Sequence, residues 1–302
     1  MTVKQYFSLL DPVIRKAVAG FDGVLPKTQQ FLFAELTRYL SALRLDVAGN
    51  ILNTPENFQL LIQAINAVIS RTLNDPEYLN AVRSYVAAFD QITKISEGYF
   101  SAAVAAFNPL DPRLVAAKQA AIVQVTQRMT GLPIQGALSQ ALTEVLQTSV
   151  TSGGSYDDLT AVLRDRLLGA PGNGGVLERY MKTFAHDAIQ EFNRSYAQNV
   201  AANFKMVFYL YEGGLQDTSR DFCRKREGKF FHEKEIRSWA RLDWEGKNPL
   251  TTESTIFTYC GGYNCNHQFL PVDSAVVPRA ALDRALAEGF LTKEEYDLIL
   301  QR

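Results

Sequence analysis

The sequence contains few of the residues from which disulfide networks and metal sites are built. Among its 302 residues are only three cysteines and three histidines. Three is an odd number and nothing in the sequence suggests export, so we expect no disulfide framework. The position of these residues is more informative than their number, because all three cysteines and two of the histidines lie within residues 223–267.

The sequence also lacks a charge bias and a long apolar segment. Its formal net charge is −1 and its pI is about 6.3, which gives no global electrostatic reason to expect binding to DNA or to an anionic membrane. No apolar run reaches the roughly 18 residues that span a bilayer, and the N-terminus lacks the pattern of a secretory signal. We therefore expect no membrane association, and a protein that stays in a cytosol or in an assembly built there.

The common catalytic motifs are absent as well. The glycines in residues 172–175 are not followed by the Gly-Lys-Ser/Thr of a phosphate-binding loop, and neither Gly-x-Ser-x-Gly nor His-Glu-x-x-His occurs. A zinc deaminase needs His-x-Glu and Pro-Cys-x-x-Cys, but Lys234 stands where the glutamate would be. These absences predict that the chain is not an enzyme.

The hydrophobic pattern predicts a mostly helical chain of the α+β class. In residues 1–108, apolar side chains recur at helical spacing, which indicates three or four helices packed on one another. Glycine-rich segments at 151–155 and 169–175 predict a flexible joint and a loop. A long helix is expected at about 176–204, followed by a strand at 206–211 that is rich in β-branched and aromatic residues.

Changes in composition divide the sequence into three parts. We expect a helical N-terminal region at residues 1–108 and a helical C-terminal tail at 276–302. Between them, residues 109–275 are predicted to form a mixed domain with a long helix, a short sheet and a loop module rich in cysteine and histidine. In the tail, Thr292 and Glu295 have the spacing of a capping box, which predicts the start of a short helix.

The loop module contains a possible zinc site. Zinc prefers thiolate and imidazole ligands in a tetrahedron, and a loop-rich segment of about 50 residues has little core of its own, so a metal could stabilise it. Gly261 and Gly262 would let the chain reverse between two of the candidates. A structural Zn²⁺ would use four of five residues, namely Cys223, Cys265 and His267 with Cys260 or His232. The alternative is that these residues are buried and stabilise the turn without a metal.

Further residues of the same module form a gapped pattern. An Asp-x-x-x-Arg-x-x-Cys-like element is followed by Gly-Lys-Phe, and then by Gly-Gly-Tyr-Asn-Cys-x-His with Pro-Val at its end. The residues that carry this pattern are Asp217, Arg220 or Asp221, Cys223, Gly228, Lys229, Phe230, Asn264, Cys265, His267, Pro271 and Val272. Over about residues 150–275 the chain resembles the phage Mu F-like minor head protein (phage head morphogenesis) family. Asn266 departs from the arginine that is usual there, and at Cys223 and His267 one zinc-compatible residue type replaces another.

This resemblance implies a structural component of a tailed bacteriophage head that acts in head morphogenesis. The implied partners are the portal or other capsid proteins, with the protein present in several copies in the virion head after assembly in the host cytoplasm. We expect the N-terminal helices to dock on such a partner. Residues 219–247 hold nine basic against six acidic side chains and include the run Arg224-Lys225-Arg226. This local excess indicates either a solvated loop or contact with packaged DNA or an acidic partner.

Two other functions stay open at this stage. One is a metal-dependent enzyme that acts on nucleic acid and is carried in the virion. Asn264 and His267 beside cysteines would suit a nuclease, but its general base would require a further histidine. The metal of such an enzyme would keep an open coordination position. The other is a host protein with a zinc-ribbon-like interaction module.

Overall fold

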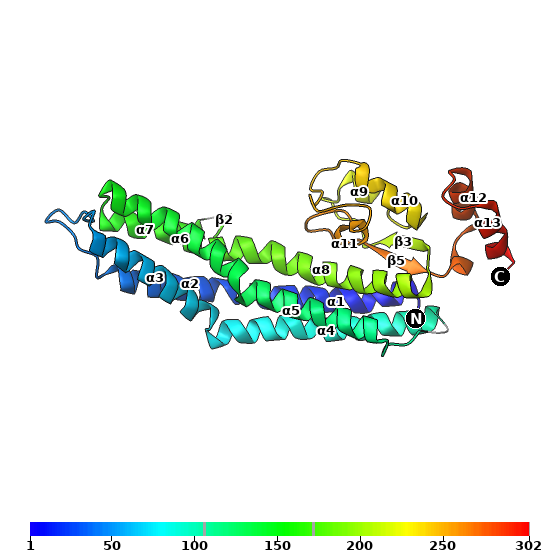
Figure 1. Ribbon diagram of the computed structural model, residues 1–302, viewed down its shortest axis with the longest axis horizontal. Helices are drawn as coiled ribbons and strands as arrows, with labels where there is room; N and C mark the ends of the chain where they lie inside the picture. Colours follow the sequence, from blue (N-terminus) through cyan, green and yellow to red (C-terminus); the bar gives the residue numbers. More distant parts are fainter. Residues whose placement is uncertain (105–106, 171–172, 302) are drawn as a thin grey trace. The chain divides into compact units, whose positions relative to one another are not determined.

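The computed structural model describes residues 1–104, 107–170 and 173–301 (Figure 1). Within them the chain is predominantly helical, with a few short strands in two small sheets, which confirms the predicted α+β class. Three predicted regions extend beyond the described residues. The positions concerned are 171–172 of the loop at 169–175, 105–106 of region 1–108 and 302 of region 276–302. No helix of the described chain is both long and apolar enough to cross a membrane.

The fold consists of two compact units, and neither is continuous in sequence. Unit 1 contains residues 1–15, 88–121 and 186–302, and unit 2 contains residues 16–87 and 122–185. These units do not follow the expected boundaries at 108 and 275, because the two ends of several long helices belong to different units. The helices that are divided in this way are α1 (Val3–Asp22), α4 (Pro76–Ala103), α5 (Pro112–Thr130) and α8 (Val176–Phe204).

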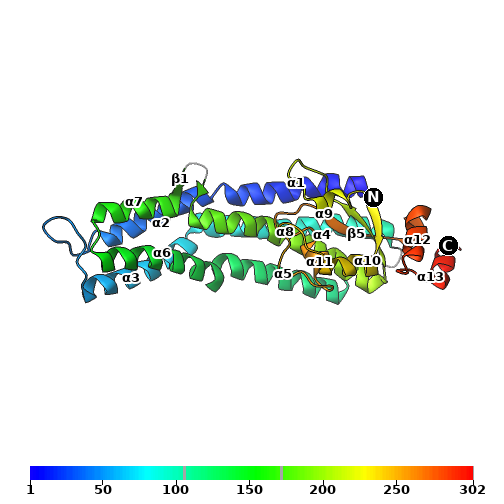
Figure 2. The ribbon, with the colours of Figure 1, turned by 90° about the horizontal axis from the view of Figure 1, so that it is seen from above.

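Unit 2 is built around a four-helix bundle. Each of its helices packs against two others, in the cyclic order α2, α3, α6, α7 (Figures 1 and 2). The predicted joint at 151–155 is a tight turn, in which Gly153 with φ of 64° ends one helix and the Ser155 side chain caps the next. The elements are α2 (Leu25–Leu40), α3 (Pro55–Leu73), α6 (Leu132–Ser152), α7 (Tyr156–Leu168) and the short hairpin of β1 (Gly169–Ala170) and β2 (Asn173–Gly174).

Unit 1 contains a three-stranded antiparallel sheet with β3 at its centre. The order is β4 (Lys229–His232), β3 (Phe208–Glu212), β5 (Gln268–Val272), so the strand expected at 206–211 is present with a small shift. We refer to residues 205–272 as the metal module. Its short helices are α9 (Asp221–Arg224), α10 (Glu233–Ser238), η1 (Trp239–Arg241) and α11 (Ile256–Tyr259). After it come η2 (Ser274–Val276), α12 (Arg279–Ala287) and α13 (Lys293–Leu300), and the predicted capping box opens α13.

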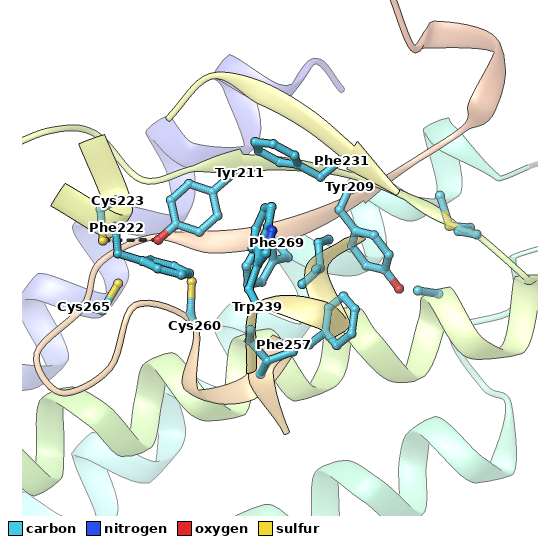
Figure 3. Close-up of a cluster of buried hydrophobic side chains, with 14 residues drawn as sticks. Tyr209, Tyr211, Phe222, Cys223, Phe231, Trp239, Phe257, Cys260, Cys265 and Phe269 are labelled. Atoms are coloured by element: carbon cyan, nitrogen blue, oxygen red, sulfur yellow. Dashed lines mark hydrogen bonds between the residues drawn. The ribbon is translucent and has the colours of Figure 1, made fainter. Parts of the chain in front are cut away.

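Both faces of this sheet are buried. Successive side chains of a strand point to opposite sides, so the side chains of β3 enter a different cluster on each face. Tyr209 and Tyr211 of β3 lie in an aromatic cluster with the residues of the loops (Figure 3). Phe208 and Leu210 lie in a second cluster, which α12 and α13 cover. The strand therefore carries buried aromatic or aliphatic side chains at four successive positions, 208–211, rather than at alternate positions.

A buried polar network explains why the N-terminal residues belong to unit 1. The Tyr6 hydroxyl donates to Asn193 Oδ1 at 3.1 Å and lies 3.3 Å from Ser96 Oγ. Asn193 in turn donates from Nδ2 to the side chain of Gln268. These residues come from α1, α4, α8 and β5, so the start of the chain completes the core on which the sheet rests.

Candidate metal centre

Cys223, Cys265 and His267 form a buried group that could hold a metal ion. Their ligand atoms all lie within 4.8 Å of one another, and each residue is at most 3% exposed. Cys223 lies on α9, whereas the other two precede β5 in the loop that follows α11. Figure 3 shows the sulfurs of Cys223, Cys265 and Cys260 at one end of the aromatic cluster. Three of the five predicted ligands are thus brought together.

His267 has the surroundings that are typical of a metal-binding histidine. Its Nδ1 lies 3.8 Å from Cys265 Sγ, and its Nε2 lies 3.0 Å from Glu227 Oε2. In metal sites the imidazole nitrogen that does not bind the metal usually faces a carboxylate or a carbonyl, which fixes the ring. The ring also stacks on Tyr211, with centroids 5.1 Å apart. Burial opposes a charge on His267, but Cys265 and Glu227 outweigh it and raise its pKa to about 9.

The thiol of Cys265 is the most acidic of the three. Hydrogen bonds from Cys223 and Cys260 hold the pKa of Cys265 well below its ordinary value, although burial opposes this. The pKa of Cys223 is raised, first by its contact with Cys265 and then by burial. Burial raises the pKa of Cys260 most, and Cys265 adds to that. These directions favour the charged form at Cys265 and the protonated forms at Cys223 and Cys260, and a divalent ion would compete with protons for the sulfurs.

Cys260 lies beside this group without being part of it. Its thiol is fully buried and contacts Cys265, but it falls outside the set of atoms that lie within 4.8 Å of one another. Its φ is 51°, in the left-handed region that is unfavourable for a residue other than glycine. Such backbone strain persists only where the surroundings impose it, so the fold fixes this thiol next to Cys265.

His232 does not belong to the group. It pairs with Phe208 across β4 and β3, and therefore lies on the opposite face of the sheet from Tyr211, whose hydroxyl contacts Cys223 Sγ at 3.2 Å. There it caps α10, because its Nδ1 accepts from the Lys234 backbone N–H at 3.2 Å. First burial and then the charge of Lys234 lower the pKa of His232 to about 4. The prediction that His232 could serve as a ligand is corrected by this strand register.

Glycine is required where the loop passes the sulfurs. A Cβ on Gly261 would lie 2.7 Å from Cys223 Sγ and 2.8 Å from Cys265 Sγ. Gly262 has a φ of 99°, and a Cβ there would lie 1.9 Å from the carbonyl oxygen of Gly246. The chain reversal that the two glycines were expected to allow is thus present, and it brings the backbone against the sulfur atoms.

Residues of α8 hold the ligand loop, and none of them was predicted from the sequence. Arg194 is 3% exposed and donates to the carbonyl oxygens of Cys265 and His267. His186 lies with its Nε2 2.8 Å from Asn266 Oδ1. The sequence pattern could have indicated Arg194, because this charged residue falls among the apolar positions of the predicted helix.

Two pockets lie beside the group. A small one of about 40 Å³ is lined in part by Cys223, Cys265 and His267. A larger surface pocket of about 870 Å³ is lined by residues of the segments 217–222 and 242–245, among others. The small pocket has room for about one water molecule, so solvent can come close to the ligand atoms.

Two residues of the basic run are engaged within the protein. Arg224 donates to the carbonyl oxygens of Ser219, Gln216 and Asp217. The Arg226 guanidinium lies over the rings of Phe222 and Trp239, at 3.8 and 4.1 Å from their centroids. These two arginines therefore stabilise the loops, and such internal roles leave fewer of their donors for an outside partner.

Comparison of the chain with protein-family models, with curated proteins and with solved structures gave no match.

Proposed function

We propose that Cys223, Cys265 and His267 bind a structural Zn²⁺ ion, with Cys260 as the fourth ligand. Thiolates and an imidazole suit zinc, whereas Mg²⁺ and Ca²⁺ prefer oxygen ligands. Cys260 supplies a further thiol beside the group, since its buried side chain already contacts Cys265. Ligation by four side chains would close the site and leave no position for a substrate, as in other structural zinc sites.

We further propose that the chain is a structural, non-enzymatic minor head protein of a tailed bacteriophage that acts in head morphogenesis. The observation that carries this proposal is the clustering of the Mu F-like pattern in one module. Gly228 leads into β4, Asn264 has a left-handed φ of 54° in the ligand loop, and Pro271 and Val272 end β5. The pattern residues thus lie in one module with the buried Cys/His group, which supports a common structural purpose for them.

The proposed partners are the portal and other capsid proteins, with several copies of the chain in each virion head, and packaged DNA as a further contact. The test is to produce heads of the same phage with and without this chain and to separate them by sedimentation. Sedimentation of the chain with heads, lost when the portal is omitted, supports the proposal. A chain that stays with the free proteins whenever heads form contradicts it.

Docking by the N-terminal helices is best tested with surface substitutions. Residues 1–15 and 88–104 contribute to unit 1, so a deletion of residues 1–108 would remove part of its core together with any docking surface. Exposed apolar residues of this region, such as Val47 and Ile62, can be changed to serine without loss of a buried contact. Loss of head incorporation in such variants, with their metal content intact, supports docking by this region.

A second function, a metal-dependent enzyme acting on nucleic acid, is favoured by one observation. The pocket of about 40 Å³ adjoins Cys223, Cys265 and His267, and two thiolates, an imidazole and a water form a ligand set that catalytic zinc sites use. Replacement of zinc by Co²⁺ separates the two functions. A closed site keeps its visible spectrum when azide is added and changes it in Cys260→Ser. An open site responds to azide and keeps its spectrum in Cys260→Ser.

A further inference from the structure

We propose that Arg194 of α8 is a positioning residue, which holds the ligand loop in the shape that metal binding requires. The inference rests on the proposed function to the extent that a metal is bound. The Arg194 side chain donates from Nε to the carbonyl oxygen of His267 at 2.9 Å and from Nη2 to that of Cys265 at 2.5 Å. It also donates from Nη1 to the carbonyl oxygen of Thr258 at 3.1 Å. One rigid group thus contacts the backbone of two proposed ligands.

The geometry of these three bonds suits arginine and no other side chain. A guanidinium is planar and presents its donors in a fixed fork, whereas a lysine ammonium is a point charge on a flexible chain. Thr258 precedes Cys260, while Cys265 and His267 follow the chain reversal. Because the guanidinium bonds to carbonyl oxygens on both sides of that reversal, it fixes the distance between the chain segments before and after the reversal.

Buried charge supplies a second reason for an arginine at this position. A divalent ion with three thiolates and a neutral imidazole carries one net negative charge, which is costly to bury without a counter-charge. The Arg194 guanidinium is almost fully buried, and Cys260 and Cys265 are among the groups that favour its charged form against the effect of burial. It therefore offsets the charge of the proposed centre.

Two neighbours on α8 hold the remaining residues of the loop. Asp187 Oδ1 accepts from the Asn264 backbone N–H at 2.8 Å, and His186 Nε2 lies 2.8 Å from Asn266 Oδ1. Together with the bonds from Arg194, α8 contacts each of residues 264–267. A loop that is ordered before the metal arrives loses less conformational freedom on binding, which increases the affinity.

The test compares Arg194→Met, Arg194→Lys and the control Arg241→Met in the full chain. Arg241 is an exposed arginine of the same module, paired with Glu253 at 2.7 Å. Zinc affinity is measured by competition with a chelator at neutral pH. We expect Arg194→Met to bind zinc about 10- to 100-fold more weakly, the range seen when groups that orient metal ligands are removed. Arg194→Lys should fall between Arg194→Met and the wild type, because it keeps the charge and loses the fork, and Arg241→Met should bind like the wild type.

A purely structural role gives a different result. In that case Arg194→Lys would lower the unfolding temperature of the metal-free and zinc-bound protein equally and would leave zinc affinity unchanged, which overturns the inference. If Arg194→Met does not fold, Asp187→Ala tests another contact between α8 and the ligand loop. Unchanged zinc affinity in both Asp187→Ala and Arg194→Lys then overturns the inference. A wild-type chain that binds no zinc instead contradicts the proposed function, so the two failures are distinguishable.

Discussion

Unit 2 and the metal module differ in what their buried side chains are and where they come from. In unit 2 the core consists mainly of leucine, isoleucine and valine from helices of 13 to 21 residues. In the metal module it consists mainly of aromatic rings and three cysteines, which come from strands of four or five residues, from short helices and from loops. The bundle can therefore form from a repeated pattern of similar side chains, whereas the module depends on single contacts.

This difference predicts how the two regions respond to substitution. A bundle core distributes its stability over many equivalent apolar contacts. In the module, the ligand loop has little regular hydrogen bonding of its own and depends on Arg194, Gly261 and the proposed metal. A substitution in the module should therefore cause a larger and more local loss of stability than a substitution of similar size in unit 2.

The largest effect is expected from loss of the metal ligands. Elemental analysis of the wild type should find about one zinc per chain, and Cys223→Ser with Cys265→Ser should contain none. Structural zinc contributes an apparent 10–16 kcal/mol or so in small zinc domains, so hydrogen exchange in residues 205–272 should accelerate strongly while the bundle keeps its protection. His232→Asn is the control, because it removes a candidate ligand that lies outside the group. Unchanged protection of the module after removal of zinc would exclude a structural metal.

How much of this comparison could be predicted from the sequence depends on the range of the interactions. The helices, the strand near 206–211 and the capping box at Thr292 follow from local patterns, and the structure contains them. The clustering of Cys223, Cys265 and His267 could also be predicted, since few cysteines and histidines exist and most lie in one window. These features need only spacing and residue type.

The remaining features depend on contacts between distant segments. The division of α1, α4, α5 and α8 between units depends on which helix ends pack together, and helical periodicity does not encode that choice. The exclusion of His232 depends on the strand at 229–232 and its register, in which a shift of one residue would move the imidazole to the other face. The role of Arg194 depends on the loop that lies against it, which comes from more than 60 positions later in the chain.

The next prediction compares the substitution of one glycine in each region. In Gly261→Ala the new methyl group would lie within 3 Å of two sulfurs, so we expect a loss of zinc binding and a destabilisation of about 3 kcal/mol or more, in the range of severe core substitutions. In α6, Gly136 has open space where a Cβ would lie, and Gly136→Ala should stabilise by about 0.5–1 kcal/mol. Chemical denaturation and metal content measure both. Equal effects of the two variants would remove the distinction between the regions.

A large-to-small substitution in the bundle tests the other side of the comparison. Leu142 of α6 is fully buried, and Leu142→Ala should destabilise the protein by about 2–5 kcal/mol through lost apolar contacts and a residual cavity. Because no residue of α6 belongs to the hydrophobic cluster of the metal module, the zinc content should stay at the wild-type value. Leu132→Ala is a matched control, since Leu132 is 81% exposed on the same helix and should change stability little. A loss of zinc in Leu142→Ala would mean that the two cores are energetically coupled.

The smallest effect is the titration of a histidine, which we expect in unit 1 because all three histidines lie there. The pKa of His232 is about 4 in the folded chain, below the ordinary value of 6.5. The unfolded chain therefore binds more protons between these values, and stability should decrease as the pH falls from about 6.5 to about 4. The neutral ring is needed because its Nδ1 accepts the N–H of Lys234. Lys234 itself favours the neutral form, and Glu295 opposes it.

The variant that isolates this effect is His232→Asn, because asparagine also caps helices well but does not titrate. Each unit of pKa shift corresponds to about 1.4 kcal/mol, so the wild type should lose up to about 3 kcal/mol more than the variant across this window. Acid also protonates the cysteine ligands, but it does so in both proteins, and the difference between their denaturation curves removes that contribution. Parallel curves from pH 7 to pH 4 would show that His232 is not buried in its neutral form. A difference that grows as the pH falls would locate an acid-sensitive contact on the face of the sheet opposite the proposed zinc.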